Sequence, residues 1–165
     1  MPSPEAEKNI QPIEIERKYL VSEFPENLSE YPKKKIQQGY LVVGTDGSEV
    51  RLRDCEGEYS LTVKSTGDMV RTERQVALTD EQFDLLWPLT DGKRVEKERY
   101  SIPFDDVEIQ LDIYTGNLEG LVTAEVEFSS VAAAELFNPP EWFGAEVTSE
   151  SSYKNQNLAT RGIPE

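Results

Sequence analysis

The sequence contains no histidine and only one cysteine, Cys55, among its 165 residues. The lack of histidine removes the commonest general base and the commonest zinc ligand. A single cysteine excludes both an internal disulfide and a cysteine-rich metal cluster. Any catalysis must therefore use carboxylates, lysines, tyrosines or a hard metal ion that is held by oxygen ligands.

Long hydrophobic runs and an excess of positive charge are also missing. No stretch approaches the roughly 18 consecutive apolar residues of a membrane-spanning helix. Residues 1–12 are rich in proline and charge, and they lack the apolar segment of a secretory signal. The formal net charge of −15 disfavours general binding to nucleic acid, because a phosphate backbone would repel the protein. We therefore expect a cytoplasmic protein with neither a nucleic acid nor a membrane as its partner.

Most of the chain consists of short stretches in which polar and apolar residues alternate, a pattern typical of strands. Strands are expected at about 13–21, 36–43, 48–54, 58–65, 70–77, 94–102, 107–115 and 121–129. Short helices are expected after a capping box at Thr79 and Gln82, after Ser130, and from about 151 to 161. The pattern predicts an α+β fold with an eight-stranded antiparallel sheet closed into a barrel. Residues 1–12 are predicted to be a disordered lead-in, and residues 13–165 a single domain.

Charged residues of the same sign recur two positions apart on these strands, so each pair shares one face of its strand. The pairs are Glu14 with Glu16, Arg51 with Arg53, Lys97 with Arg99, and Glu125 with Glu127. Any one pair could belong to an ordinary solvent-exposed face, but like charges repel unless an ion of opposite sign lies near them. Basic pairs suit phosphate oxygens, and acidic pairs suit Mg²⁺ or Mn²⁺. Together the pairs indicate a metal and phosphate site.

Seven motifs, in sequence order, resemble those of the CYTH superfamily, the triphosphate tunnel metalloenzymes. They are Glu14-Ile-Glu-Arg-Lys18, Arg51-Leu-Arg53, Leu61-Thr-Val-Lys64, Arg71-Thr-Glu73, Lys97-Glu-Arg99, Gln110-Leu-Asp112 and Ala124-Glu-Val-Glu127. A C-terminal segment with Glu146-Val-Thr148 and Tyr153 also resembles the short bacterial members. The chain departs from the family pattern at Gln75 and Gln110, where relatives carry glutamate, and at Ser152, where they tend to carry arginine.

The resemblance implies an eight-stranded antiparallel barrel around a charged tunnel, with a few helices packed outside. It also implies a bound triphosphate and one or two divalent cations, Mg²⁺ or Mn²⁺. The implied metal ligands are Glu14, Glu16, Asp112, Glu125 and Glu127. The implied phosphate contacts are Lys18, Arg51, Arg53, Lys64, Arg71, Lys97 and Arg99. Glu14, Glu16 and Glu73 are the candidate catalytic residues; Glu73 would orient a base or balance charge, or else form a tunnel salt bridge.

The leading hypothesis is a metal-dependent triphosphatase that acts on tripolyphosphate or a related small-molecule triphosphate. A class IV-type adenylate cyclase and a thiamine triphosphatase are alternatives within the same superfamily, since the same site could serve each reaction. A non-catalytic polyphosphate-binding module is a further alternative, kept open by Gln75 and Gln110. The sequence leaves the oligomeric state open, with a homodimer among the alternatives.

Overall fold

The computed structural model describes residues 13–165, and the prediction for residues 1–12 lies outside the described residues. The strands are β1 (Ile13–Val21), β2 (Lys33–Val43), β3 (Glu49–Cys55), β4 (Glu58–Lys64), β5 (Val70–Leu78), β6 (Arg94–Phe104), β7 (Val107–Thr115), β8 (Val122–Glu127) and β9 (Phe143–Glu146). The α-helices are α2 (Asp80–Leu86), α3 (Val131–Leu136) and α4 (Asn155–Arg161). Short 3₁₀ turns are η1 (Leu28–Glu30), η2 (Trp87–Thr90), η3 (Gly116–Leu118) and η4 (Ser151–Tyr153).

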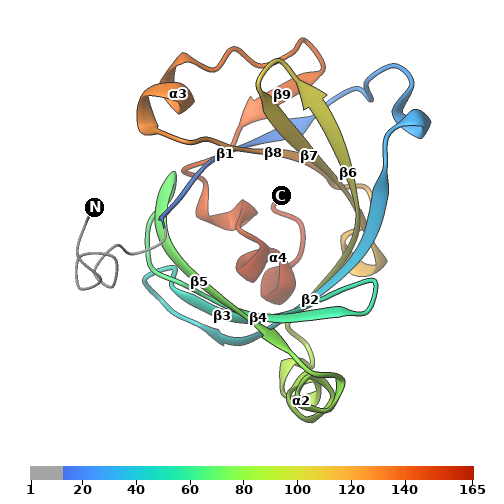
Figure 1. Ribbon diagram of the computed structural model, residues 1–165, viewed down its shortest axis with the longest axis vertical. Coiled ribbons are helices and arrows are strands. Elements are labelled where there is room, and N and C mark those ends of the chain that lie inside the picture. The colour runs from blue at the N-terminus through green and yellow to red at the C-terminus, as the bar shows by residue number, and fades with distance from the viewer. Residues whose placement is uncertain (1–12) are drawn as a thin grey trace, which may run out of the picture.

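Eight of these strands close into an antiparallel barrel, which confirms the predicted fold class (Figure 1). Their order around the barrel is β5, β4, β3, β2, β6, β7, β8 and β1, and β1 pairs again with β5 to complete the ring. β9 pairs only with the end of β1 and was not predicted. Closure leaves no unpaired edge within the ring, so the inward residues of every strand line one shared interior.

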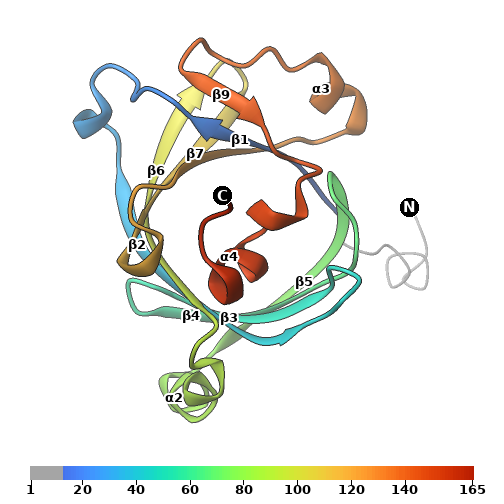
Figure 2. The same cartoon turned by 180° about the vertical axis from the view of Figure 1, so that it is seen from behind.

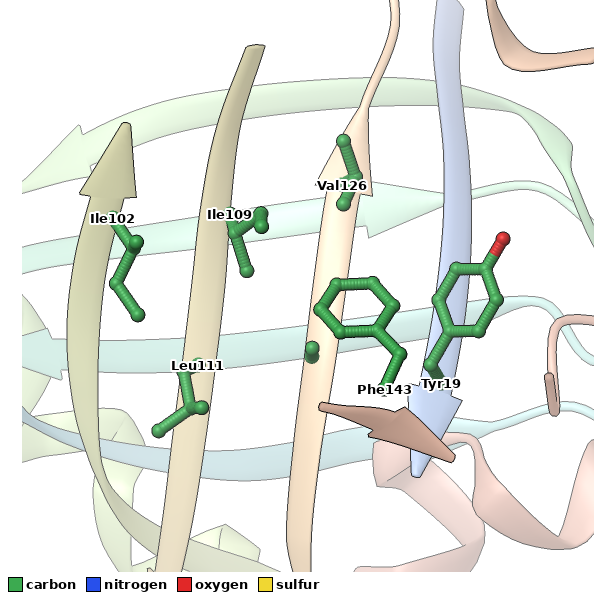
Figure 3. Close-up of a cluster of buried hydrophobic side chains, with 7 residues drawn as sticks. Tyr19, Ile102, Ile109, Leu111, Val126 and Phe143 are labelled. Atoms are coloured by element: carbon green, nitrogen blue, oxygen red, sulfur yellow. The ribbon is translucent and has the colours of Figure 1, made fainter. Parts of the chain in front are cut away.

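The apolar faces of β1, β6, β7 and β8 point outward and are buried beneath β9 and the segment that precedes it (Figure 3). The cluster drawn there consists of Ala124 and the six labelled residues, Tyr19, Ile102, Ile109, Leu111, Val126 and Phe143. Phe137, just after α3, packs against the same cluster. Burying one large apolar side chain contributes about 1.5–3 kcal/mol. This wall of the barrel therefore holds a hydrophobic core outside the ring, which frees the interior for charged residues.

Helices α2 and α3 lie outside the barrel, and both begin at the predicted caps (Figure 1). The backbone N–H of Gln82 donates to the hydroxyl of Thr79, and the backbone N–H of Thr79 donates to the side chain of Gln82. The hydroxyl of Ser130 accepts from the backbone N–H of Ala133 at 3.0 Å. These bonds satisfy N–H groups that the first helical turn leaves free.

Helix α4 differs from the expectation that helices pack outside, since it lies within the outline of the barrel in both views (Figures 1 and 2). Its Leu158 is buried against an apolar group made of Val95, Tyr114, Leu118 and Leu121. Helix α4 thus shields the apolar residues at one end of the interior from solvent. The expected helix over 151–161 is interrupted at Lys154, which is extended, and α4 ends at Gly162 with φ +80°. Among residues 13–165, no helix combines the length and apolar character that crossing a membrane requires.

Candidate functional site

The interior of the barrel contains a cavity of about 200 Å³ that is lined almost entirely by polar and charged side chains. Its cationic lining residues are Lys18, Arg51, Arg53, Lys64, Arg71, Arg99 and Lys154. Its anionic lining residues are Glu14, Glu16, Glu49, Asp68, Glu73, Glu125 and Glu127. The two sets are equal in number, so the lining has no formal net charge. A cavity of this kind suits a ligand that itself combines anions with cations.

Strand pairing brings the predicted motifs onto the same inner face. Glu16 of β1 lies opposite Glu127 of β8, and two residues further along Lys18 lies opposite Glu125. In the strands that follow β1 on its other edge, Lys64 of β4 lies opposite Glu73 of β5. Alternation places these side chains inward because residues two apart share a face. The placement on one shared face agrees with the interpretation of the charged pairs in the sequence.

Three carboxylates lie close together in one part of this cavity. They belong to Glu14, Glu16 and Glu127, which we call the acidic cluster. One carboxylate oxygen from each lies within 4.8 Å of the others. Burial and the neighbouring carboxylates Glu125 and Glu14 hold the pKa of Glu16 well above its usual range. Burial, together with a hydrogen bond to Glu73, raises the pKa of Glu14 to about 7 despite the nearby Lys64. Without a cation, burial and the neighbouring carboxyl groups therefore favour the protonated forms of Glu14 and Glu16.

Basic side chains face the same cavity from β3 and β4. The ammonium of Lys64 donates to both carboxylate oxygens of Glu14 at 3.0 Å and lies 3.3 Å from Glu73. Arg53 donates to the amide oxygen of Gln38, which is fully buried. Burial and the neighbouring Arg51 and Arg99 guanidinium groups lower the pKa of Arg53 to about 10. Crowded cations of this kind are stabilised by an added anion such as a phosphate.

A second group of charges lies in the wall of the barrel, and we call Lys97, Arg99, Asp112 and Glu125 the buried network. Asp112 is fully buried and accepts from Lys97 at 2.7 Å and from Arg99 at 2.7 and 2.8 Å. Arg99 also reaches Glu125 at 3.3 Å. Arg99 and then Lys97 hold the pKa of Asp112 below its usual value although burial alone would raise it. Glu125 likewise has a lowered pKa, because Lys18 and Arg99 outweigh its burial.

This arrangement separates two predicted residues from the cavity. Lys97 was expected to bind phosphate and Asp112 to bind metal, but neither belongs to the cavity lining. Their charges are instead paired with each other behind Arg99. The remaining predicted site residues all line the cavity. Gln75 and Gln110, the two departures from the family pattern, line it as well, whereas Ser152 is exposed in η4.

Sequence reasoning missed several lining residues. Glu49 precedes Arg51 by two positions, so the alternation that placed Arg51 inward would also have found it. Thr148 and Lys154 come from the C-terminal segment, where no periodic pattern marks them. Lys154 donates to the carbonyl of Gly67 at 2.8 Å and so ties this segment to the loop between β4 and β5. Only the folded path of the chain brings these residues to the cavity.

Comparison with known proteins places the chain among relatives of similar length. No family model matches it. An inorganic triphosphatase from Nitrosomonas europaea is 47% identical over 147 residues, which cover 88% of this chain and 96% of that protein. An inorganic triphosphatase from Acetivibrio thermocellus is 34% identical over 148 residues, covering 88% and 92%.

The fold of this chain is also similar to those of solved structures. A crystal structure of an inorganic triphosphatase matches with a TM-score of 0.67 and 45% identity, over 92% of this chain and 97% of that one. A putative adenylate cyclase from Bacillus halodurans matches with a TM-score of 0.53 at 19% identity, over 76% and 86%, and shows the shared fold alone. From the identities, the coverage and the barrel, we conclude that this chain belongs to the inorganic triphosphatase family of the CYTH superfamily.

Proposed function

We propose that this protein hydrolyses inorganic tripolyphosphate inside the barrel with the help of a divalent cation, Mg²⁺ or Mn²⁺. The observation that supports this most is the cavity itself, in which the acidic cluster faces basic side chains of β3 and β4. Both curated relatives that match over most of their length are inorganic triphosphatases. A small-molecule triphosphate is accordingly the proposed partner.

The acidic cluster has the chemistry that a hard divalent cation needs. Carboxylate oxygens are the ligands that Mg²⁺ and Mn²⁺ prefer. Burial and the neighbouring carboxylates raise the pKa of Glu16, an effect that a bound cation would oppose. Glu14, Glu16 and Glu127 would hold the ion, with Glu125 beside them. When bound there, the cation would supply charge neutralisation of phosphoryl oxygens.

The chain's own residues would do the remaining work by positioning and electrostatics, which dominate phosphoryl transfer. Arg51, Arg53 and Arg99 would donate to phosphate oxygens and stabilise the charge that develops on them. Lys64 contacts both Glu14 and Glu73, and so sits between the acidic cluster and the basic residues. The pKa of Glu73 is lowered, since its contacts with Glu14, Lys64 and Arg51 outweigh its burial. An ionised Glu73 is suited to orient an attacking water.

The size and lining of the cavity favour a substrate without an organic group. Sites for drug-sized ligands usually measure about 300–1,000 Å³ and are mostly apolar. This cavity is smaller, and Val147 is its one apolar lining residue among the described part of the chain. A cyclase must hold adenine and ribose firmly to align the 3′-hydroxyl, and the lining provides no such surface. Tripolyphosphate is therefore the proposed substrate in preference to ATP or thiamine triphosphate.

A substrate panel tests this function. Tripolyphosphate, ATP and thiamine triphosphate are each incubated with Mg²⁺ or Mn²⁺, and phosphate, pyrophosphate and cyclic AMP are measured. We expect phosphate to be released fastest from tripolyphosphate, with no appreciable cyclic AMP. Cyclic AMP and pyrophosphate formed in equal amounts, faster than tripolyphosphate is cleaved, would identify a cyclase instead. Tight binding of tripolyphosphate without any turnover would identify a binding module.

A further inference from the structure

Glu49, the first residue of β3, connects two of the cationic residues that line the cavity. Its side chain is buried, and one carboxylate oxygen lies 3.1 Å from an Nη of Arg71 on β5. The other oxygen lies 3.7 Å from an Nη of Arg51 on β3 itself. β4 lies between β3 and β5 in the sheet, so the carboxylate links side chains that the backbone does not pair directly.

The two arginines that meet at Glu49 differ in how their donors are used. Arg71 is fixed by the protein, because its Nε donates to the carbonyl of Ser65 at 3.0 Å and an Nη donates to the carbonyl of Gly47 at 2.9 Å. Arg51 is buried as well, yet its Nε has no hydrogen-bond partner among the described residues. The outer carboxylate oxygen of Glu49, Oε2, also has no hydrogen-bond partner there. Buried polar groups without partners are rare in native proteins, and a bound ion or water is one explanation for them.

We propose that Glu49 is a positioning residue for tripolyphosphate: anchored by Arg71, its carboxylate holds the Arg51 guanidinium toward the cavity with donors left free for a phosphoryl group. This inference rests on the proposed function and adds a residue to it. The 3.7 Å separation supports it, since it exceeds hydrogen-bond distance and lets the charge of Glu49 orient Arg51 without occupying a donor. Burial of the Glu49 carboxylate raises the strength of this attraction.

This role divides the cationic residues into two kinds. Arg71 lines the cavity, but its guanidinium already donates to the carbonyls of Ser65 and Gly47 and pairs with Glu49. Arg51 lines the same cavity, and its guanidinium lies farther from Glu49, at 3.7 Å, than that of Arg71 does, at 3.1 Å. We therefore assign the direct phosphate contact to Arg51, and to Arg71 the task of holding Glu49.

The test compares Glu49→Gln with wild type. Glutamine keeps the shape of the side chain but removes the charge that orients Arg51. Glu98→Gln is the matched control, because Glu98 pairs with Lys33 on the surface, away from the cavity. Steady-state turnover of tripolyphosphate with Mg²⁺ is measured for each variant. Binding of sodium tripolyphosphate is measured by calorimetry with Ca²⁺ in place of Mg²⁺.

We expect Glu49→Gln to raise KM and the dissociation constant roughly tenfold or more, as when one charge-assisted hydrogen bond is lost. The value of kcat should change much less, because Arg51 contacts the substrate before and during the reaction. In an Arg51→Gln background, Glu49→Gln should have little further effect, since its action passes through Arg51. A residue with a purely structural role would weaken binding equally in both backgrounds, and that result would overturn the proposal.

Glu49→Asp keeps the test decisive if the glutamine variant folds poorly. It retains the buried charge but withdraws the carboxylate by one methylene, so we expect a smaller loss of affinity than with glutamine. Wild-type affinity in both Glu49 variants would overturn the proposal. If wild type binds tripolyphosphate without hydrolysing it, the proposed function fails, while the ratio of affinities still decides the role of Glu49.

Discussion

The acidic cluster and the buried network lie side by side in one barrel, but their charges are balanced in different ways. In the buried network, Asp112 is fully enclosed and bound by both Lys97 and Arg99 at hydrogen-bond distance. In the acidic cluster, carboxylates approach one another instead, and burial and like charge raise the pKa of Glu16. In the first group both carboxylates have cationic partners, whereas in the second Glu14 pairs with Lys64 and, among residues 13–165, Glu16 and Glu127 form no ion pair within 4.0 Å.

We interpret this difference as a division between the pair of Asp112 and Lys97, whose charges hold the barrel together, and the acidic cluster, whose charges we propose to bind a cation. Both groups belong to motifs of the same family and look alike in the sequence. A buried carboxylate with two cationic partners contributes to a specific folded structure, and its loss leaves unpaired cations. A carboxylate crowded by others lowers stability until a cation arrives. The two groups should therefore respond in opposite ways to mutation, ligand and pH.

The largest expected effect is on stability when the buried network is broken. Asp112→Asn leaves Lys97 and Arg99 buried without their shared counterion. We expect a loss of about 3–5 kcal/mol in the free energy of unfolding, measured by urea denaturation without metal. A loss below about 1 kcal/mol would show that this network does not stabilise the barrel.

Replacing the acidic pair should affect activity rather than folding. Glu14→Gln with Glu16→Gln removes metal ligands but keeps the volume of the cavity. We expect turnover of tripolyphosphate to fall roughly 1,000-fold, which corresponds to about 4 kcal/mol. The melting temperature without metal should stay level or rise, because like charges are removed. Full activity in this double variant would remove β1 from the site.

Ligand binding should stabilise the acidic cluster and leave Asp112 and Lys97, the two members of the buried network that do not line the cavity, as they are. Tripolyphosphate with Mg²⁺ binds the folded protein, so it should raise the melting temperature by linkage. At a free concentration a hundredfold above the dissociation constant, the gain is roughly 2.7 kcal/mol. An unchanged melting curve at concentrations that calorimetry shows to be saturating would contradict binding inside the barrel.

The pH dependence of stability should have opposite signs in the two groups. The pKa of Glu14 is raised to about 7 in the folded protein, so the folded state holds a proton that the unfolded state releases near its ordinary value. Stability from this group is fully present below its ordinary pKa and is lost as the pH rises through about 7, by roughly 3 kcal/mol. The pKa of Asp112 is lowered in the folded protein, so this group contributes stability at any pH above its ordinary pKa. That contribution is lost only in acid, as the pH falls through the lowered pKa.

Mg²⁺ provides the control for this pH dependence. Urea denaturation is repeated across pH with and without the cation. Because the cation favours ionised carboxylates, the decline toward pH 7 should disappear when it is present. A decline that persists unchanged in Glu14→Gln without metal, or that saturating Mg²⁺ leaves intact, would assign it to another group.

The barrel could be predicted from the sequence because alternation is a local property. The eight strands agree with the expected ranges within a few residues, although β2 begins at Lys33 rather than 36, where three consecutive lysines hide the alternation. β9 has four residues, Phe143–Glu146, and gives too short a pattern to recognise. The position of α4 depends on which apolar residues line the end of the interior, and that follows from strand order.

The site was predictable in part for the same reason. Alternation places Glu16 and Lys18 on one face, and the family motifs predict metal binding for Glu16 and phosphate binding for Lys18. Which charges pair with each other depends on strand register. Arg99 lies opposite Asp112, so these two side chains form an ion pair. Only the three-dimensional pairing shows that Asp112 is already bound, and only the folded path brings Lys154 to the cavity. Sequence therefore identified charged positions, and the structure shows which of them are already paired.

The central claim is that the acidic cluster is the part of the interior left for a cation. Titration of Mn²⁺, followed by calorimetry, tests it most directly in wild type, in Glu16→Gln and in the surface control Glu98→Gln. We predict that wild type and Glu98→Gln bind Mn²⁺ with the same affinity and that Glu16→Gln binds at least tenfold more weakly. Equal affinity in all three proteins would contradict the account.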